Sequence, residues 1–275
     1  MSKNEIIEKI FSCPCCKSEM YVSENGKSVY CRGKKRHCYD FSADGYLSLG
    51  QGGGDSKEAV RARKSFLSGG AYDMAACAVV DTVAGLVDNN STVIDAGCGE
   101  GYYTNKIAEI CGGAVGFDLS KFACSAGAKS ARAKGISNIL YATGSVFELP
   151  IADGSADCVV NIFAPCAETE YLRVLKDGGY LIVVGAGREH LMGLKKVIYD
   201  NPYENEGRAD LPKNMTYIDT VNCKYETKIE GNDNILALFS MTPYYWRTSE
   251  SDKNKLTGPL ELTTTVDFEI NIYKK

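Results

Sequence analysis

The sequence lacks any run of apolar residues that approaches the roughly 18 needed to cross a membrane as a helix. Its first eleven positions mix lysine with glutamate instead of placing a basic end before an apolar stretch, so no signal peptide is visible. No internal repeat is apparent. We therefore expect a cytoplasmic protein with no membrane partner.

An excess of positive charge is also missing, because 35 acidic residues against 31 basic ones give a formal net charge of −4. This balance argues against a protein that is basic all over, the simplest signature of a nucleic-acid binder. It does not exclude a local patch. Such a patch lies within residues 27–36, which include Lys27, Arg32, Lys34, Lys35 and Arg36. A run like this is usually a solvated face, and RNA contact is the alternative.

What the sequence does have is cysteine: twelve residues without a secretion signal, which indicates thiols kept reduced rather than paired as disulfides. Cys13 and Cys16 are separated by two residues, and Cys31 follows with either His37 or Cys38. A two-residue gap lets two thiolates reach one tetrahedral ion, and a second pair closes a four-ligand shell. The spacing predicts a structural zinc site, with reactive or buried thiols as the alternative.

Three regions differ in composition. Residues 1–50 hold the cysteine cluster, and residues 51–88 open with a glycine-rich linker and continue with helical periodicity. From residue 89 to 275, short apolar runs alternate with amphipathic stretches, as in an α/β domain with a parallel sheet covered on both faces. We expect strands at 92–95, 114–118, 139–143, 157–162 and 180–184, helices at 102–110, 121–134 and 168–175, and a final strand pair, 224–229 and 262–273, around a helix at 235–241.

The clearest chemical motif joins the first of these strands to the first helix. Asp95 is followed by Gly97, Gly99 and Gly101, whose lack of a side chain lets the backbone turn sharply and approach a ligand. Asp118 ends the second strand, 23 positions after Asp95. Its carboxylate can accept both ribose hydroxyls of a nucleotide-like cofactor there. The glycine spacing differs from the dinucleotide fingerprint and resembles motif I of class I S-adenosylmethionine-dependent methyltransferases. An NAD-type dehydrogenase is the remaining contender.

Over nearly its whole length the chain resembles the bacterial 23S ribosomal RNA guanine-N1 methyltransferases that modify a hairpin near the macrolide-binding exit tunnel. The matching segments occur in order along both halves of the chain. They include Cys13-Pro14-x-Cys16, residues 40–49, residues 54–56, residues 62–67, Gly70-Ala71-Tyr72, residues 97–104, Ala164-Pro165-Cys166, His190-Leu191-Met192 and Met241-Thr242-Pro243.

The resemblance implies a class I methyltransferase fold: a Rossmann-like, mostly parallel seven-stranded sheet with a small N-terminal zinc-binding domain over residues 1–50 that recognises RNA. It implies that Cys13, Cys16, Cys31 and His37 hold Zn²⁺. It also implies that S-adenosylmethionine contacts Tyr72, Gly99, Glu100 and His190, beside Asp95, Gly97, Gly101 and Asp118 of the motif. A homodimer is implied by the resemblance alone.

Three departures from the family bear on these expectations. The loop from Cys31 to His37 is longer than usual, which leaves Cys38 as a candidate ligand. Gly193 stands where the family tends to have glutamate, and the proline usual before Arg188 is missing, so the geometry around His190 is open.

The resemblance implies transfer of a methyl group to N1 of a guanine in a 23S rRNA hairpin. Asn161 and Phe163 end the fourth strand, where substrates meet cofactor in this fold. Phe163 is expected to stack on the base, with an ordinary core role as the alternative, and Asn161 or backbone carbonyls are expected to hold the edge of the base. The sequence identifies no general base. One alternative is a methyltransferase of a small molecule or another RNA position, and another is a non-catalytic zinc-containing RNA-binding module.

Overall fold

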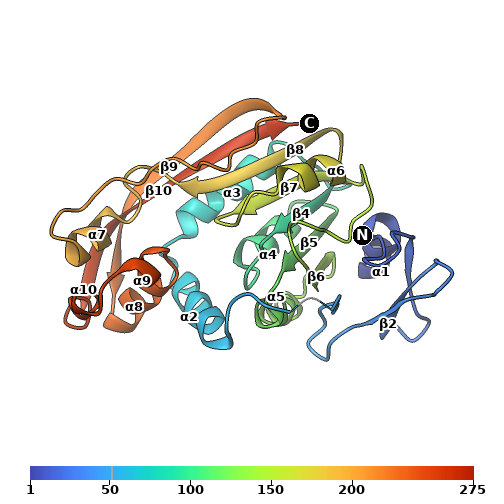
Figure 1. Cartoon of the computed structure of the whole chain (residues 1–275), viewed down its shortest axis with the longest axis horizontal. Helices are drawn as coiled ribbons and strands as arrows, with labels where there is room; N and C mark the ends of the chain where they lie inside the picture. Colours follow the sequence, from blue (N-terminus) through green and yellow to red (C-terminus); the bar gives the residue numbers. More distant parts are fainter. Residues whose placement is uncertain (51) are drawn as a thin grey trace.

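The computed structural model describes residues 1–50 and 52–275, and a seven-stranded sheet forms its centre (Figure 1). The strand order is β6-β5-β4-β7-β8-β10-β9, in which the first five strands run parallel and β10 lies antiparallel between β8 and β9. This confirms the expected class I methyltransferase fold. The strands are β4 (Thr92–Ala96), β5 (Gly113–Asp118), β6 (Ile139–Thr143), β7 (Ala156–Ile162), β8 (Leu175–Ala186), β9 (Thr216–Glu230) and β10 (Glu261–Lys274).

The central strands are apolar because both of their faces are covered. Every residue of β4 and β6 is buried, which accounts for the unbroken apolar runs in the sequence. The helices of this part of the chain are α2 (Lys57–Ser68), α3 (Asp73–Ala84), α4 (Tyr102–Ala108), α5 (Lys121–Ala133), α6 (Glu168–Val174), α7 (Met192–Ile198), α8 (Asn232–Ser240), α9 (Tyr244–Arg247) and α10 (Glu250–Asn254). The helices α4, α5 and α6 follow β4, β5 and β7 as crossover connections.

The final hairpin is longer than the sequence predicts. β9 and β10 pair along 15 and 14 residues, and the connection between them carries α8, α9 and α10. Figure 1 shows these three helices at one end of the molecule, next to α2. None of the helices in the described part of the chain is both long and apolar enough to span a bilayer.

Two apolar cores lie on the two faces of the sheet. Alternate residues of β4 separate them, since Val93 belongs to one and Ile94 to the other. The second core is completed by a helix that the sequence did not predict, α1 (Lys3–Ile10), in which Ile6, Ile7 and Ile10 are fully buried. The start of the chain is therefore packed against the methyltransferase sheet.

The cysteine-rich segment folds as a small antiparallel sheet of β1 (Met20–Val22), β2 (Ser28–Cys31) and β3 (Cys38–Asp40), at the other end of the molecule from α8–α10 (Figure 1). Leu47 then pairs with the edge of β6: its N–H donates to Tyr141 O at 2.8 Å and its carbonyl accepts from Thr143 N at 3.0 Å. The predicted linker begins at residue 51, which lies outside the described residues. The proposed boundary at residue 50 stays a prediction.

Candidate active site and metal centre

The glycine motif forms the turn between β4 and α4. Gly97, Gly99 and Gly101 have φ angles of 90°, 54° and 82°, a region that other residues rarely adopt. A Cβ added to Gly97 would also collide with the Cβ of Ala164 in the loop after β7, because the two atoms would be 2.5 Å apart. The backbone of the glycine turn therefore lies next to the carboxyl ends of β4 and β7, where ligands bind in this type of sheet.

Asp118, at the end of β5, ties this loop to the next helix. Its carboxylate accepts hydrogen bonds from the backbone N–H of Gly99 at 3.0 Å and of Ser120 at 2.7 Å. A carboxylate has about four acceptor positions, so two remain for ribose hydroxyls. Burial raises the pKa of Asp118, and the two backbone hydrogen bonds oppose that rise.

Two other acidic groups beside the loop have acceptor atoms without partners. Asp95 Oδ2 accepts from Thr104 Oγ1 at 2.6 Å, but buried Asp95 Oδ1 has no hydrogen-bond partner among the described residues, and neither has Glu100 Oε2. Burial raises the pKa of Asp95 to about 7, and burial also raises the pKa of Glu100. A buried unpaired acceptor costs about 1–3 kcal/mol, and a ligand group with N–H donors, such as the ammonium group of S-adenosylmethionine, fits these two oxygens.

Tyr72 and His190 contact each other. His190 Nδ1 accepts from the backbone N–H of Asp267 at 3.2 Å, which places the ring proton on Nε2, 3.4 Å from the Tyr72 hydroxyl. Burial lowers the pKa of His190 to about 3, so the ring is neutral at physiological pH. His190 therefore orients Tyr72, whose own hydroxyl proton stays free to donate.

Close packing against β10 explains why glycine occupies position 193 in this chain. A side chain there would collide with the backbone of β10 at Thr263 and Thr264, against which α7 lies. This close approach fixes the segment that follows His190.

Phe163 follows the last residue of β7 and is held in an unusual conformation. Its φ of 52° is in the left-handed region, which bulky residues rarely adopt. The residue is also 48% exposed. Its ring stacks on His190 with centroids 5.8 Å apart and contacts Phe268 at 4.9 Å. Residues with such backbone conformations cluster at functional sites, so Phe163 is a candidate site residue.

Asn161, by contrast, is fully buried and hydrogen-bonded within the chain. Its amide donates to Pro165 O at 3.0 Å and to Tyr171 Oη at 3.0 Å, and its oxygen accepts from Arg208 Nη1 at 3.2 Å. These contacts hold the loop that carries Phe163.

The four cysteine and histidine residues expected to bind zinc come together. The possible ligand atoms of Cys13, Cys16, Cys31 and His37 all lie within 4.8 Å of one another. His37 Nδ1 is 3.4 Å from Cys13 Sγ and 3.5 Å from Cys31 Sγ, and the sulfurs of Cys16 and Cys31 are 3.6 Å apart. Zinc bonds of about 2.3 Å to sulfur and about 2.0 Å to nitrogen place tetrahedral ligands roughly 3.5–3.8 Å apart, so the residues fit that ion.

Neighbouring cysteines lie outside this cluster of four. Cys38 is exposed and lies outside the cluster, and Cys15 contacts the Tyr39 hydroxyl at 3.4 Å. The same hydroxyl lies 3.2 Å from Cys13 Sγ, where it can donate to a thiolate. Gly33, in the longer loop, leaves room that a side chain would take, because a Cβ there would be 2.7 Å from Cys16 Sγ.

Two arginines next to the active site were not predicted as site residues. Arg63 on α2 pairs with Asp55 and lies 3.8 Å from Glu100, and Arg208 holds the loop after β7 through Ala164 O at 2.8 Å. The periodicity of residues 57–68 reveals the helix but not which face meets the glycine loop. Arg208 lies in a stretch without periodicity, so the sequence carries no signal for it.

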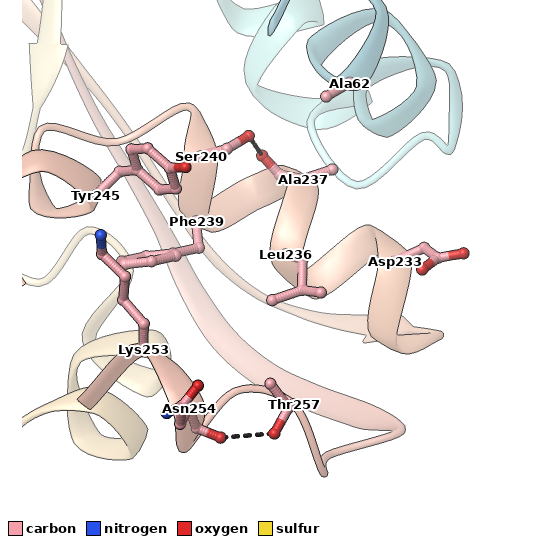
Figure 2. A pocket seen from close by; sticks show the side chains of 10 residues that line it. All are labelled: Ala62, Asp233, Leu236, Ala237, Phe239, Ser240, Tyr245, Lys253, Asn254 and Thr257. Carbon is pink, nitrogen blue, oxygen red and sulfur yellow. Dashed lines mark hydrogen bonds between the residues drawn. The ribbon is translucent and has the colours of Figure 1, made fainter. Parts of the chain in front are cut away.

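A hollow of about 460 Å³ lies elsewhere, between α2 and the helices α8–α10 (Figure 2). Figure 2 shows Lys253 and Tyr245 side by side in it, with the ammonium 4.8 Å from the ring centroid. Among its lining residues are none of those predicted to bind cofactor or metal.

Comparison with known proteins agrees with this geometry. Residues 87–255 match a family model described as "Methyltransferase domain". A Bacillus subtilis (strain 168) protein named "Putative 23S rRNA (guanine-N(1)-)-methyltransferase YxjB" is 28% identical over 99% of this chain and 100% of its own length. A Micromonospora griseorubida protein with the same description is 26% identical over 94% of this chain and 95% of its own.

The "23S rRNA (guanine(748)-N(1))-methyltransferase" of Streptomyces fradiae is 30% identical over 70% of this chain and 69% of its own length. The glycine loop and the sheet order are those of an S-adenosylmethionine-dependent methyltransferase. The chain therefore belongs to the methyltransferase-domain family, among the relatives that are named 23S rRNA (guanine-N1)-methyltransferases.

Proposed function

We propose that this protein methylates N1 of a guanine in a hairpin of 23S ribosomal RNA. The observation that carries the proposal is the match to relatives with that name over the whole chain, including the cysteine-rich segment that a methyltransferase domain alone does not need. We also propose that Cys13, Cys16, Cys31 and His37 hold a structural zinc ion.

When bound, S-adenosylmethionine would supply the methyl group that guanine N1 accepts as it loses its proton, with S-adenosylhomocysteine as the leaving group. The chain's part is to align the base and exclude water. Phe163 is exposed at the end of β7 and offers its ring as a stacking surface for a base presented from a loop or flipped out. Neutral His190, with Nδ1 engaged, orients Tyr72 and does not take up the N1 proton.

The proposed RNA surface lies on the cysteine-rich segment and combines basic side chains with tyrosine rings. Arg32, Lys34, Lys35 and Arg36 are exposed on the loop between β2 and β3. The guanidinium of Arg32 lies 4.9 Å from the Tyr21 ring centroid, and that of Arg36 lies 4.9 Å from the Tyr30 centroid. Such a loop suits the RNA backbone, which gives affinity without reading sequence.

The proposal is tested by the nucleoside that forms. Purified protein is incubated with unmodified 23S rRNA transcript and S-adenosylmethionine carrying a CD₃ group, and the digested RNA is analysed by mass spectrometry. We expect CD₃-labelled 1-methylguanosine, and Phe163→Ala should raise the Michaelis constant for RNA while cofactor affinity stays constant. Label in another nucleoside, or none in RNA, contradicts the proposal.

A further inference from the structure

Arg63 is a partly buried cation that lies directly against the glycine loop. Its side chain is only 26% exposed, and a Cβ added to Gly99 would be 3.3 Å from its Nη1 atom. Burial opposes its charge, but the carboxylates of Asp55 and Glu100 hold the pKa of Arg63 above its usual value. A permanent positive charge thus stands at the edge of the proposed cofactor pocket.

The guanidinium has more donors than the described residues satisfy. Of its five N–H groups, Arg63 uses Nη2 for the hydrogen bond and ion pair with Asp55. Nη1 is 3.8 Å from Glu100 Oε2, which is an ion-pair distance but too long for a hydrogen bond, and that oxygen has no hydrogen-bond partner among the described residues. Donors and an acceptor therefore face the same space without engaging each other.

Asp55 fixes the guanidinium in this place. Its carbonyl accepts from Ser120 Oγ at 2.7 Å, so the segment before α2 is tied to the turn that begins at Asp118. Gly54 lies beside the same turn, where a Cβ would be 2.8 Å from Ser120 N. Arg63 is held in position from the side of the pocket that carries the proposed ribose acceptor.

The charges around the loop match an amino-acid zwitterion. Buried Asp95 Oδ1 and Glu100 Oε2 are acceptors in need of a donor, which an ammonium group supplies. The guanidinium presents donors in the fork geometry that suits a carboxylate. We propose that Arg63 binds the α-carboxylate of the cofactor's methionine end, with the ammonium group turned to the two unpartnered carboxylate oxygens. This inference rests on the cofactor and not on the RNA substrate.

The test compares two ligands by titration calorimetry. S-adenosylhomocysteine has both the ammonium and the carboxylate, whereas S-adenosyl-3-thiopropylamine has the ammonium alone. A charge-assisted hydrogen bond is worth about 1.5–3 kcal/mol, so Arg63→Gln should weaken S-adenosylhomocysteine binding roughly tenfold to a hundredfold. Binding of the decarboxylated ligand should change less than about twofold.

Two further variants make the result specific. Arg61→Ala removes an exposed arginine from the same helix and should leave both affinities unchanged. Arg63→Lys keeps the charge but loses the fork, so its loss for S-adenosylhomocysteine should lie between those of wild type and Arg63→Gln. Equal loss for both ligands would show that Arg63 only supports the loop, and unchanged S-adenosylhomocysteine binding would remove it from the pocket; either result overturns the proposal.

Discussion

Protonation of Asp95 should control cofactor affinity between pH 6 and pH 8. Its pKa is raised to about 7, mainly by burial, and the charges of Asp118 and Glu100 add to the effect. A positively charged ligand favours the ionised carboxylate. The affinity for S-adenosylmethionine should therefore be highest above the pKa of Asp95 and fall as the pH drops through about 7.

The size of the effect follows from the ionised fraction. With a pKa of about 7, Asp95 is roughly 90% ionised at pH 8 and roughly 10% ionised at pH 6, a tenfold change worth about 1.4 kcal/mol. Asp95→Asn resembles the protonated form at every pH. The ratio of wild-type to Asp95→Asn affinity should thus rise up to about tenfold from pH 6 to pH 8, and taking the ratio cancels titration of the cofactor itself.

Titration calorimetry at pH 6, 7 and 8 measures this ratio. Asp157→Asn is a matched control, because Asp157 lies at the other end of the strands, where it accepts from Thr92 N at 2.8 Å and pairs with Lys176. Its ratio to wild type should stay flat. If the Asp95→Asn ratio were equally flat, the proposed contact between this carboxylate and the cofactor would be refuted.

The same pKa has a consequence for folding. Because the pKa of Asp95 is raised on folding, protonated Asp95 stabilises the cofactor-free protein fully below the usual value of 3.8, and that stability is lost as pH rises through about 7. The difference corresponds to about 4 kcal/mol at most. Bound cofactor should reduce this loss, which thermal unfolding with and without S-adenosylhomocysteine would detect.

Three other predictions concern the metal, the RNA and the ribose. Purified protein should hold one zinc ion per chain, and Cys16→Ser should lose it while Cys15→Ser keeps it; equal loss in metal analysis would refute this choice of ligands. Replacing Lys34, Lys35 and Arg36 by alanine should raise the Michaelis constant for RNA and flatten its salt dependence, whereas wild-type kinetics at every salt concentration would exclude the loop. Asp118→Ala should weaken S-adenosylmethionine binding about a hundredfold or more by calorimetry, since two charge-assisted hydrogen bonds are lost, and unchanged affinity would contradict its ribose role.

The sequence predicted the sheet well because parallel strands are buried on both faces and leave continuous apolar runs. It missed α1, although Ser2 and Glu5 form a capping box before Ile6, Ile7 and Ile10. The full extent of β9 was not predicted because its first residues are mostly exposed and lack an apolar alternation. Pairing with β10, and not local propensity, determines that strand.

For the site, the motif identified the loop but not its neighbours. The choice between His37 and Cys38 could not be made from adjacent positions, because it depends on which of the two side chains turns toward the sulfurs of Cys13, Cys16 and Cys31. The partners of Asn161 lie as far away as Arg208, a contact across 47 positions that no local pattern contains. The spacing of residues in the sequence does not predict tertiary contacts of this kind.

The measurement that tests the central proposal most directly is mass mapping of guanine N1 methylation in 23S rRNA from a strain in which this gene is deleted. We expect one 1-methylguanosine to be absent there, with all other modifications retained, and to return when the wild-type protein is supplied but not the Asp118→Ala variant. An unchanged methylation map in the deletion strain would contradict the proposal.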